Sequence, residues 1–391
     1  MIQDVNPFVY SRPVPPEDVV DRDAEVADLL QHAVGGHYVR LYAPRKYGKT
    51  SLLTRALHDG ERSEGLIGVL VDLYRVASVA DVTVRLERAY AKHLRGELRG
   101  RVESFLQRTG VGLSLGAFGI SARLQVDPAR DPLPALHALL DLPLRLEASG
   151  GFRALVVFDE FQDIGRIDGL DGLLRSHIQH HGEVASYVFA GSEPALMRLL
   201  FETKERPLYG SAVPMRLGRL ADADLAAYVD ARFEQTGRRA GEALGPLLVA
   251  ARGHPQRAML LSHRLWEEVP AGGEATLDHW SAAHAAALRE LEAEFDAQWR
   301  GLDVSQQKTL RALLLGDGAP YRSAPLRRLE LTKDVVRRAL PRLAATAEIE
   351  EREEGGYSLV DPLFAEWVGR LNDRALSSGS GSVDNGIEPG L

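Results

Sequence analysis

In the first half of the chain, short runs of consecutive apolar residues alternate with longer segments whose apolar residues recur every three or four positions. The runs have the length and composition of buried strands, and the segments between them have helical spacing. The runs occupy residues 37–43, 66–74, 154–158, 185–192 and 212–217. The helical segments occupy residues 21–36, 50–60, 78–98, 133–148 and 193–203. This alternation predicts an α/β fold with a parallel sheet covered by helices on both faces.

The second half of the chain has a different pattern. Helical spacing continues to about Trp299, and three further helical pieces are followed by two short strands around Gly355 and Gly356. Three helices and a hairpin are typical of a winged helix-turn-helix. The predicted domains are an N-terminal arm (1–20), a core (21–220) with a hairpin inserted at about 110–127, a helical lid domain (221–300), a winged helix-turn-helix (301–373) and a flexible tail (374–391).

The composition limits the classes of protein to consider. The chain has 391 residues, of which 45% are hydrophobic and 26% charged, as in soluble globular proteins. A net charge of -8 excludes a surface that is basic throughout, so any contact with nucleic acid requires a local patch. The absence of cysteine excludes disulfides and thiolate chemistry. With no signal peptide pattern and no apolar run of membrane-spanning length, we expect a soluble, cytoplasmic protein without a membrane partner.

One loop between a strand and a helix resembles a phosphate-binding loop. The stretch "LYAPRKYGKTSLL" matches G-x-x-x-x-G-K-[ST], except that Ala43 replaces the first glycine. Backbone N–H groups at a helix N-terminus would surround phosphates, a lysine would reach the β and γ phosphates, and a hydroxyl would bind Mg²⁺. The predicted nucleotide-binding residues of this loop are Ala43, Pro44, Arg45, Lys46, Tyr47, Gly48, Lys49, Thr50 and Ser51.

Two acids end the apolar strand of "ALVVFDEF". Asp159 stands where a Walker B strand places its Mg²⁺-side carboxylate, together with Thr50 of the loop, and Glu160 would polarise the attacking water. Solvated acids at a strand end are common by themselves. Their combination with the loop in an α/β frame favours a site for ATP and Mg²⁺.

The order of motifs along the chain resembles a known family. "NPFVYSRPV", "VDRDAEVADLL", "YAPRKYGKTSLL", "ALVVFDEFQDI", "YVFAGS", "LYGSAVPMRLGRL", "RGHPQRAMLLSHRLW" and "GGYSLVDPLFAEWV" look like archaeal-type P-loop ATPases of the STAND and AAA+ groups, which are related to origin-recognition initiator ATPases. The resemblance runs from Asn6 to about Leu371. It implies a P-loop NTPase core with a helical lid and a C-terminal winged helix-turn-helix.

The resemblance also implies roles for particular residues. Lys49 and Glu160 would be catalytic, with Glu160 as the base, and Ser192 would be the sensor that reads the γ-phosphate. The "GHP" motif of Gly253, His254 and Pro255 would touch the nucleotide and couple its state to the domain angle. The predicted residues near the adenine are Asn6, Phe8 and Arg22. From the residues alone, Ser192 could instead cap a helix, and Gly253 and Pro255 could start one.

The chain departs from the family pattern at two places. Ala43 stands where the loop usually begins with glycine, which bears on turnover more than on binding. Ser211 stands where an arginine often follows "LYG", and Arg206 is the nearest alternative arginine finger, although a solvated surface arginine is the commoner case. Turnover is therefore expected to be slow unless an arginine arrives from a neighbouring copy in a homo-oligomer.

The last predicted domain has a local basic patch. Between residues 319 and 346 the chain has seven basic residues and only two acidic ones, Glu330 and Asp334. They are Arg322, Arg327, Arg328, Lys333, Arg337, Arg338 and Arg342. Phosphate contacts of this kind would bind duplex DNA in a salt-dependent way, and Arg327, Arg328, Lys333, Arg337 and Arg338 are the expected contacts. An acidic wing with Glu348, Glu350, Glu351, Glu353 and Glu354 opposes this reading, and Pro341 should kink or shorten the helix.

The sequence thus predicts an ATP-dependent molecular switch that hydrolyses ATP and moves a lid and a winged helix. A DNA-binding initiator or regulator and a non-hydrolysing scaffold that binds a protein partner remain alternatives. The histidines His177, His180 and His181 could suggest a metal site, but a solvated helix face is favoured because no carboxylate or cysteine partner stands nearby in the sequence.

Overall fold

The structure is a computed structural model, and it describes residues 5–93, 131–352 and 354–379. The hairpin expected at 110–127 lies outside the described residues. The chain forms two compact units, which we call the sheet unit (residues 13–218) and the helical unit (residues 1–12 and 219–391). The N-terminal arm is thus divided between the two units.

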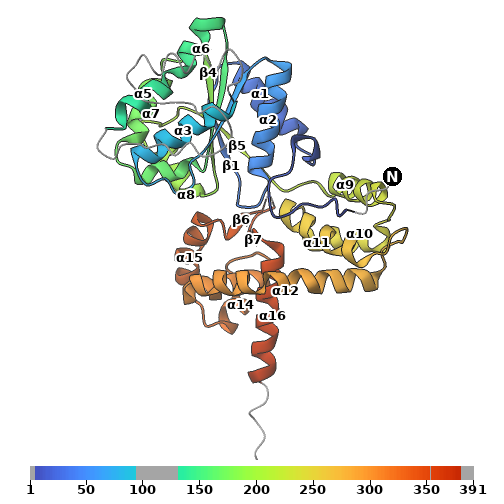
Figure 1. The fold of residues 1–391 in the computed structure, drawn as a ribbon. Helices are drawn as coiled ribbons and strands as arrows, with labels where there is room; N and C mark the ends of the chain where they lie inside the picture. Colours follow the sequence, from blue (N-terminus) through green and yellow to red (C-terminus); the bar gives the residue numbers. More distant parts are fainter. Residues whose placement is uncertain (1–4, 94–130, 353, 380–391) are drawn as a thin grey trace, which may run out of the picture. The chain divides into compact units, whose positions relative to one another are not determined.

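The sheet unit is built on five parallel strands (Figure 1). The strands are β1 (Val39–Tyr42), β2 (Ile67–Asp72), β3 (Ala154–Asp159), β4 (Ala185–Gly191) and β5 (Val213–Arg216), in the spatial order β2-β3-β4-β1-β5. Val157 of β3 pairs with Val188 of β4, and Val39 of β1 pairs with the same Val188. Since all strands run the same way, the loops after β1, β3 and β4 meet at one edge of the sheet.

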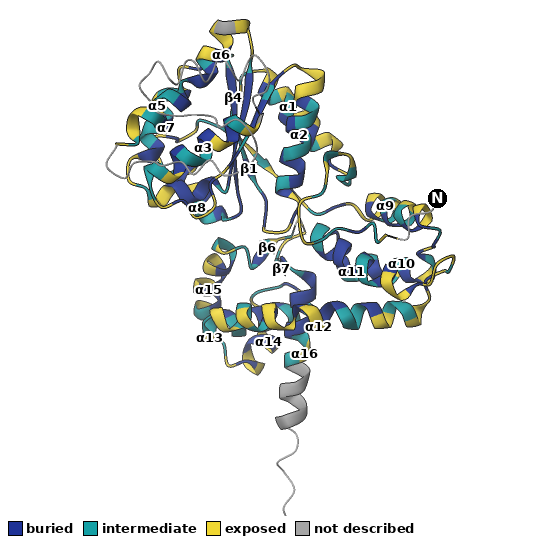
Figure 2. Ribbon diagram, in the orientation of Figure 1, coloured by how far each residue is buried: buried dark blue, intermediate teal, exposed yellow. Residues whose placement is uncertain are grey.

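Helices cover both faces of this sheet. They are α1 (Asp23–Val34), α2 (Lys49–Ser63), α3 (Val79–His93), α5 (Leu133–Leu140), α6 (Leu142–Gly150), α7 (Leu170–Ile178) and α8 (Pro194–Glu202), with 3-10 turns η1 (Pro16–Asp18) and η2 (Phe161–Arg166). In Figure 1, α1 and α2 cover one face, and α3, α5 and α7 cover the other. Figure 2 shows the central strands dark, since every residue of β3 and β4 is buried, and the outer sides of the helices exposed. The predicted α/β fold is confirmed.

The helical unit contains the rest of the chain. Its elements are α9 (Asp222–Gln235), η3 (Gly241–Ala243), α10 (Leu244–Ala251), α11 (Pro255–Glu268), α12 (Leu277–Gly301), α13 (Val304–Leu315), α14 (Ser323–Arg328), α15 (Lys333–Ala345), β6 (Ile349–Glu351), β7 (Tyr357–Leu359) and α16 (Pro362–Gly379). Strands β6 and β7 pair antiparallel. The three helical pieces and the hairpin expected from the sequence are present, but their division into a lid and a winged helix stays a prediction.

Several local expectations differ from the structure. Helix α2 does not stop at Gly60, which has no positive φ, but continues to Ser63, and the left-handed glycine that follows it is Gly65 with φ 64°. The helix expected over 133–148 is divided at Asp141, and Pro143 lies in the first turn of the second part. Pro341 lies inside α15 without shortening it. Helix α16 reaches Gly379 and so includes the first residues of the segment expected as a tail.

Candidate functional site

The loop after β1 has the conformation that its glycine predicts. Gly48 has φ 79° and is the N-cap of α2, and Lys46 also has a positive φ of 68°. A Cβ on Gly48 would meet nothing within 4 Å, so the space beside the start of α2 is open. No side chain caps this helix among the described residues, which leaves its first N–H groups to bind an anion.

Ala43 fits the loop without strain. Its N–H donates to the carbonyl of Gly191 at 3.2 Å, and its methyl group is fully buried. Ala43 is not among the described residues with positive φ, so the backbone at this position does not require glycine. The substitution for the first glycine of the motif is therefore compatible with the shape of the loop.

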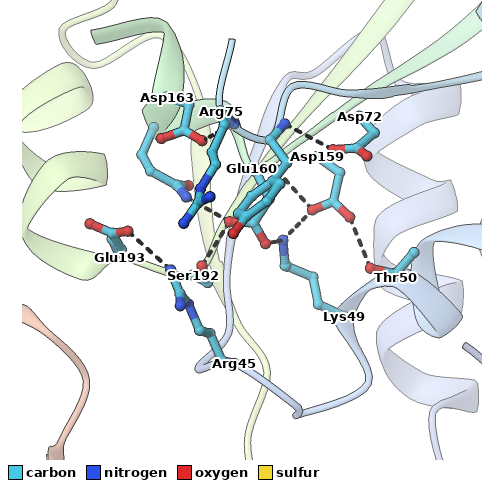
Figure 3. Close-up of polar contacts among 12 residues, drawn as sticks. Arg45, Lys49, Thr50, Asp72, Arg75, Asp159, Glu160, Asp163, Ser192 and Glu193 are labelled. Atoms are coloured by element: carbon cyan, nitrogen blue, oxygen red, sulfur yellow. Dashed lines mark hydrogen bonds and ion pairs between the residues drawn. The ribbon is translucent and has the colours of Figure 1, made fainter. Parts of the chain in front are cut away.

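Lys49 lies between the two acids that end β3 (Figure 3). Its Nζ donates to Oδ1 of Asp159 and, at 2.8 Å, to Oε1 of Glu160. Thr50 Oγ1 donates to the second oxygen of Asp159 at 2.9 Å. Residues more than 100 positions apart in the sequence thus meet because α2 begins beside the carboxyl end of β3.

Glu160 is held by three further features. The residue has φ 53°, in the left-handed region, and its Oε2 accepts hydrogen bonds from Gln162 Nε2 at 2.6 Å and from Ser192 Oγ at 2.7 Å. Burial raises the pKa of Glu160, but the charge and hydrogen bond of Lys49, with the bonds from Gln162 and Ser192, hold the pKa below its ordinary value. Glu160 is therefore a positioned carboxylate at neutral pH.

The donor set of this cluster fits a phosphate and a divalent cation. One ammonium group faces two carboxylates, so the three side chains carry a net charge of -1 in a largely buried place. A hydroxyl and a carboxylate, Thr50 and Asp159, stand side by side as oxygen ligands of the kind Mg²⁺ takes. Lys49 and the N-terminus of α2 supply the positive side for phosphate oxygens.

Other predicted residues of the sheet unit have different partners. Arg45 pairs with Glu193 at 3.4 Å. Ser51 Oγ accepts from the N–H of Val14 at 3.2 Å, which fastens the segment before η1 to α2. Arg206 pairs with Asp171 in the first turn of α7 at 3.1 Å and is not part of the Lys49 cluster.

Arg22, expected near the adenine, is buried and joins two distant segments of the sheet unit. Its guanidinium donates to the carbonyl of Gly218 at 2.7 Å and to Glu25 at 2.6 Å. Gly218 is the last residue before the chain enters the helical unit. Arg22 therefore fixes this exit point, and its contact with a nucleotide stays a prediction.

The remaining predicted residues lie in the helical unit. Asn6 Nδ2 donates to the carbonyl of His263 at 3.0 Å, and the Phe8 ring packs on Phe233 with ring centroids 5.4 Å apart. These contacts fasten the arm to α9 and α11. Their role beside a nucleotide stays a prediction.

The "GHP" motif forms the start of α11. Gly253 has φ 68°, and a Cβ there would lie 2.3 Å from the carbonyl oxygen of Leu220. His254 caps the helix by accepting from the N–H of Arg257 at 3.4 Å, and Pro255 is the first helical residue. Each residue type has a local structural reason, and their contact with a nucleotide also stays a prediction.

Sequence reasoning missed three residues beside the Lys49 cluster. Gln162 orients Glu160, and the buried Asp163 accepts from the N–H of Arg75 at 2.6 Å. The polar letters of "DEFQD" at the end of a buried strand were an available signal for the first two. Nothing in the sequence pattern indicated Arg75, because its position depends on β2 lying next to β3.

The interpretation of His177, His180 and His181 as a solvated helix face is wrong for two of them, since only His180 is exposed and only His177 lies in α7. His181 is buried, and burial lowers its pKa to about 4. His177 does have a carboxylate partner, since its Nδ1 lies 2.6 Å from Asp141 and its Nε2 lies 2.7 Å from His137. Among the described residues, no group of three or more histidine or acidic side chains could hold a metal ion.

The parallel sheet, the loop after β1 and the Lys49 cluster together define an α/β fold of the P-loop type, as the resemblance implied. The chain is similar to the Walker-type ATPase PABY2304 of Pyrococcus abyssi, with a TM-score of 0.68 and 18% identity over 92% of this chain and 99% of that one. It is also similar to the ORC2 protein of Aeropyrum pernix in its ADPNP–ADP complexes, with a TM-score of 0.57 and 16% identity over 95% and 98% of the two chains. At these identities the likeness is one of fold.

The sequence matches no protein-family model and no curated protein. Within the described residues, no helix combines the length and apolarity needed to cross a membrane.

Proposed function

We propose that this protein is an ATP-binding molecular switch that hydrolyses ATP slowly and couples the nucleotide state to rearrangement of its lid and winged helix. The observation that carries the proposal is the cluster in which Lys49 and Thr50 contact Asp159 and Glu160. The Aeropyrum relative in fold was solved in complexes with ADPNP and ADP, which supports a nucleotide as the ligand.

The proposed reaction is attack of water on the γ-phosphate. Glu160 is ionised and oriented by Ser192 and Gln162, so it can accept a hydrogen bond from the attacking water and take its proton. Lys49 stabilises negative charge on the phosphate oxygens. Mg²⁺, held by Thr50 and Asp159, would supply further charge compensation.

The switch part of the proposal rests on how the chain crosses between the units. Gly218 is held by Arg22 within the sheet unit. The next residue, Arg219, belongs to the helical unit, where it donates to Glu350 at 2.7 Å and to the carbonyl of Val360 at 2.8 Å. The crossing point is thus fastened on both sides, which is the arrangement needed to pass a movement from one unit to the other.

The test compares Glu160→Gln with Lys49→Ala. We expect Glu160→Gln to keep ATP binding and to lower phosphate release at least about 100-fold, and Lys49→Ala to lose both. Glu183→Gln is a matched control, because Glu183 is exposed and precedes β4 at the opposite edge of the sheet. If the wild type binds ATP but releases phosphate no faster than Lys49→Ala, hydrolysis is excluded and a nucleotide-binding scaffold remains.

A second candidate function is binding of duplex DNA by the basic face of α14 and α15. Two of the acids that opposed it point to partners in the helical unit: Glu350 pairs with Arg219 at 2.6 Å, and Glu348 accepts from Gln298 at 2.6 Å. The charge of Glu350 is therefore compensated by Arg219, while Glu348 is held by a neutral amide and keeps its charge. Arg327, Arg328, Lys333, Arg337 and Arg338 are exposed.

The DNA candidate is tested by titrating labelled duplex at several salt concentrations. Affinity should fall steeply with salt, and reversing the charge of Arg337 and Arg338 to glutamate should weaken binding at least about tenfold at low salt. Arg289→Glu, at an exposed position of α12, is the control. Absence of binding by the wild type at low salt would exclude this function.

The oligomeric state bears on both candidates. An arginine supplied by a neighbouring copy would speed the proposed hydrolysis, as the sequence led us to expect. Light scattering with and without ATP would show whether copies assemble.

A further inference from the structure

Arg75 has an unusual backbone conformation at the edge of the candidate site. It follows β2 with φ 55°, in the left-handed region that residues with a side chain rarely adopt. Such a conformation is strained and persists where the surroundings enforce it, often at functional sites.

The surroundings of Arg75 do enforce it. Its N–H donates to the buried Asp163 at 2.6 Å. The preceding residue, Tyr74, donates its N–H to Asp72 at 2.8 Å, and its carbonyl accepts from Arg85 at 3.0 Å. The loop after β2 is thus fastened to the loop after β3, which contains Glu160.

These bonds set the direction of the Arg75 side chain. Figure 3 shows it extending from the loop toward the side of the cluster where Glu160 and Ser192 lie. Its guanidinium lies 5.2 Å from the centre of the Tyr74 ring, and in the described part of the chain it has no ion pair with a carboxylate. The side chain is exposed, so a ligand could reach it.

The chemistry of this group suits a phosphate. A guanidinium presents paired N–H donors in a plane that matches two phosphate oxygens, and an aromatic ring beneath it limits its freedom without using those donors. A lysine or a flexible surface arginine would lose more rotamer freedom on binding.

We propose that Arg75 contacts the terminal phosphate of bound ATP from within the same chain and stabilises the charge that develops there during hydrolysis. This inference rests on the proposed ATP-binding function. It assigns the role of the arginine finger to Arg75 of the same chain. From the sequence pattern, the nearest candidate for this role was Arg206, with weak support. It also predicts that Arg75 distinguishes ATP from ADP, since ADP lacks the phosphate concerned.

The experiment measures the affinities of full-length variants for ATP and for ADP, together with phosphate release. Arg75→Gly is the informative variant, because glycine adopts φ 55° freely and keeps the loop conformation. We expect its affinity for ATP to fall about tenfold with ADP affinity unchanged, and phosphate release to fall at least about 100-fold. Arg75→Lys should restore part of the ATP preference but not the full rate.

Arg62→Ala is the matched control, since it removes one exposed arginine at the far end of α2 and should change neither quantity. If Arg75→Gly keeps the wild-type ratio of ATP to ADP affinity, the inference is wrong. If the wild type binds neither nucleotide, the proposed function itself fails. The two failures are therefore distinguishable.

Discussion

Each of the two units contains a group of buried charges, and the groups differ in how completely the polar groups around them are satisfied. In the helical unit, Arg257 of α11 is fully buried and donates to Asp361 at 2.9 Å and to Glu294 of α12 at 3.2 Å. The second oxygen of Asp361 accepts from the N–H groups of Leu363 and Phe364 at the start of α16. This network joins the consecutive helices α11 and α12 to α16, which is far from them in the sequence.

In the sheet unit, Lys49 is shared between Asp159 and Glu160 at an open edge of the sheet. As in the Arg257 network, two carboxylates share one cation, but here the first N–H groups of α2 have no side-chain cap among the described residues. In the Arg257 network the N–H groups at the start of α16 are bonded to Asp361, while the cluster around Lys49 leaves the N–H donors of α2 for a ligand. The difference shows that burial of charge alone does not indicate a functional site.

The largest effect is expected where the Arg257 network is broken. Asp361→Asn leaves Arg257 buried without its main counter-charge, and removal of one partner of a buried pair costs about 3–5 kcal/mol. Urea denaturation at pH 7 measures this loss. Glu366→Gln, which affects a more exposed pair with His284, should cost less than about 1 kcal/mol.

The pH dependence of the free energy of unfolding tests the contribution of the Asp361–Arg257 pair. Burial raises the pKa of Asp361, but the charge and hydrogen bond of Arg257 hold it below its ordinary value. The folded state therefore binds this proton less readily than the unfolded state, so the stabilisation is present above about pH 4 and is lost as the pH falls further. A loss in Asp361→Asn no larger than that in Glu366→Gln would contradict this interpretation of the Arg257 network.

A buried carboxyl group whose pKa is raised should make stability depend on pH in the opposite direction. Glu87 of α3 is buried, its Oε2 has no hydrogen-bond partner in the described residues, and burial raises its pKa to about 7. The folded state keeps the proton while the unfolded state loses it, so stability decreases as the pH rises from about 4.3 toward 7. Glu87→Gln should therefore stabilise the protein at pH 8 by up to about 3 kcal/mol and have little effect at pH 4.

Thermal unfolding of wild type and Glu87→Gln at both pH values measures this difference. Glu64→Gln, an exposed change at the C-terminal end of α2, is the control. An equal effect of Glu87→Gln at the two pH values would show that the carboxyl group is solvated.

A smaller effect is expected at Ala43 of the loop. Its methyl group is buried and its φ does not require glycine, so Ala43→Gly should lower stability by about 0.5–1 kcal/mol through the added freedom of the unfolded chain. We expect ATP affinity to change less than threefold. A much larger gain in affinity or in phosphate release would show that the methyl group obstructs the phosphate.

The smallest effect concerns the pH profile of phosphate release. Because the pKa of Glu160 lies below its ordinary value, this carboxylate stays ionised from pH 8 to pH 5, and its titration should not lower the rate in that range. Steady-state rates at saturating ATP measure the profile. A decrease centred near pH 6.5 would contradict the assignment of a charged, pre-oriented Glu160.

Much of the sheet unit could be predicted from the sequence. All five strands and most of the helices between them follow from apolar runs and helical spacing, because a parallel sheet buried on both faces requires continuous apolar strands. The phosphate-binding loop and the acidic strand end were each visible in the sequence. Each is a short motif whose few characteristic residue types stand close together.

Local errors arose where backbone conformation or a residue distant in the sequence decided the structure, and the residue type alone did not. Gly60 does not end α2, because the left-handed conformation that follows the helix is adopted by Gly65. The Asp141 partner of His177 could not be seen from the α7 segment alone, since it stands 36 positions earlier in the chain.

The sequence by itself determined the class of fold and the residues Lys49, Thr50, Asp159 and Glu160 as a candidate site. Only the tertiary structure decided which charges close on one another, as Arg257 and Asp361 do, and which remain open to a ligand. It also decided that Arg75 stands beside the site. The physical reason is that a charge is satisfied by neighbours in space, and β2 and β3 are neighbours although more than 80 residues separate Arg75 from Asp163.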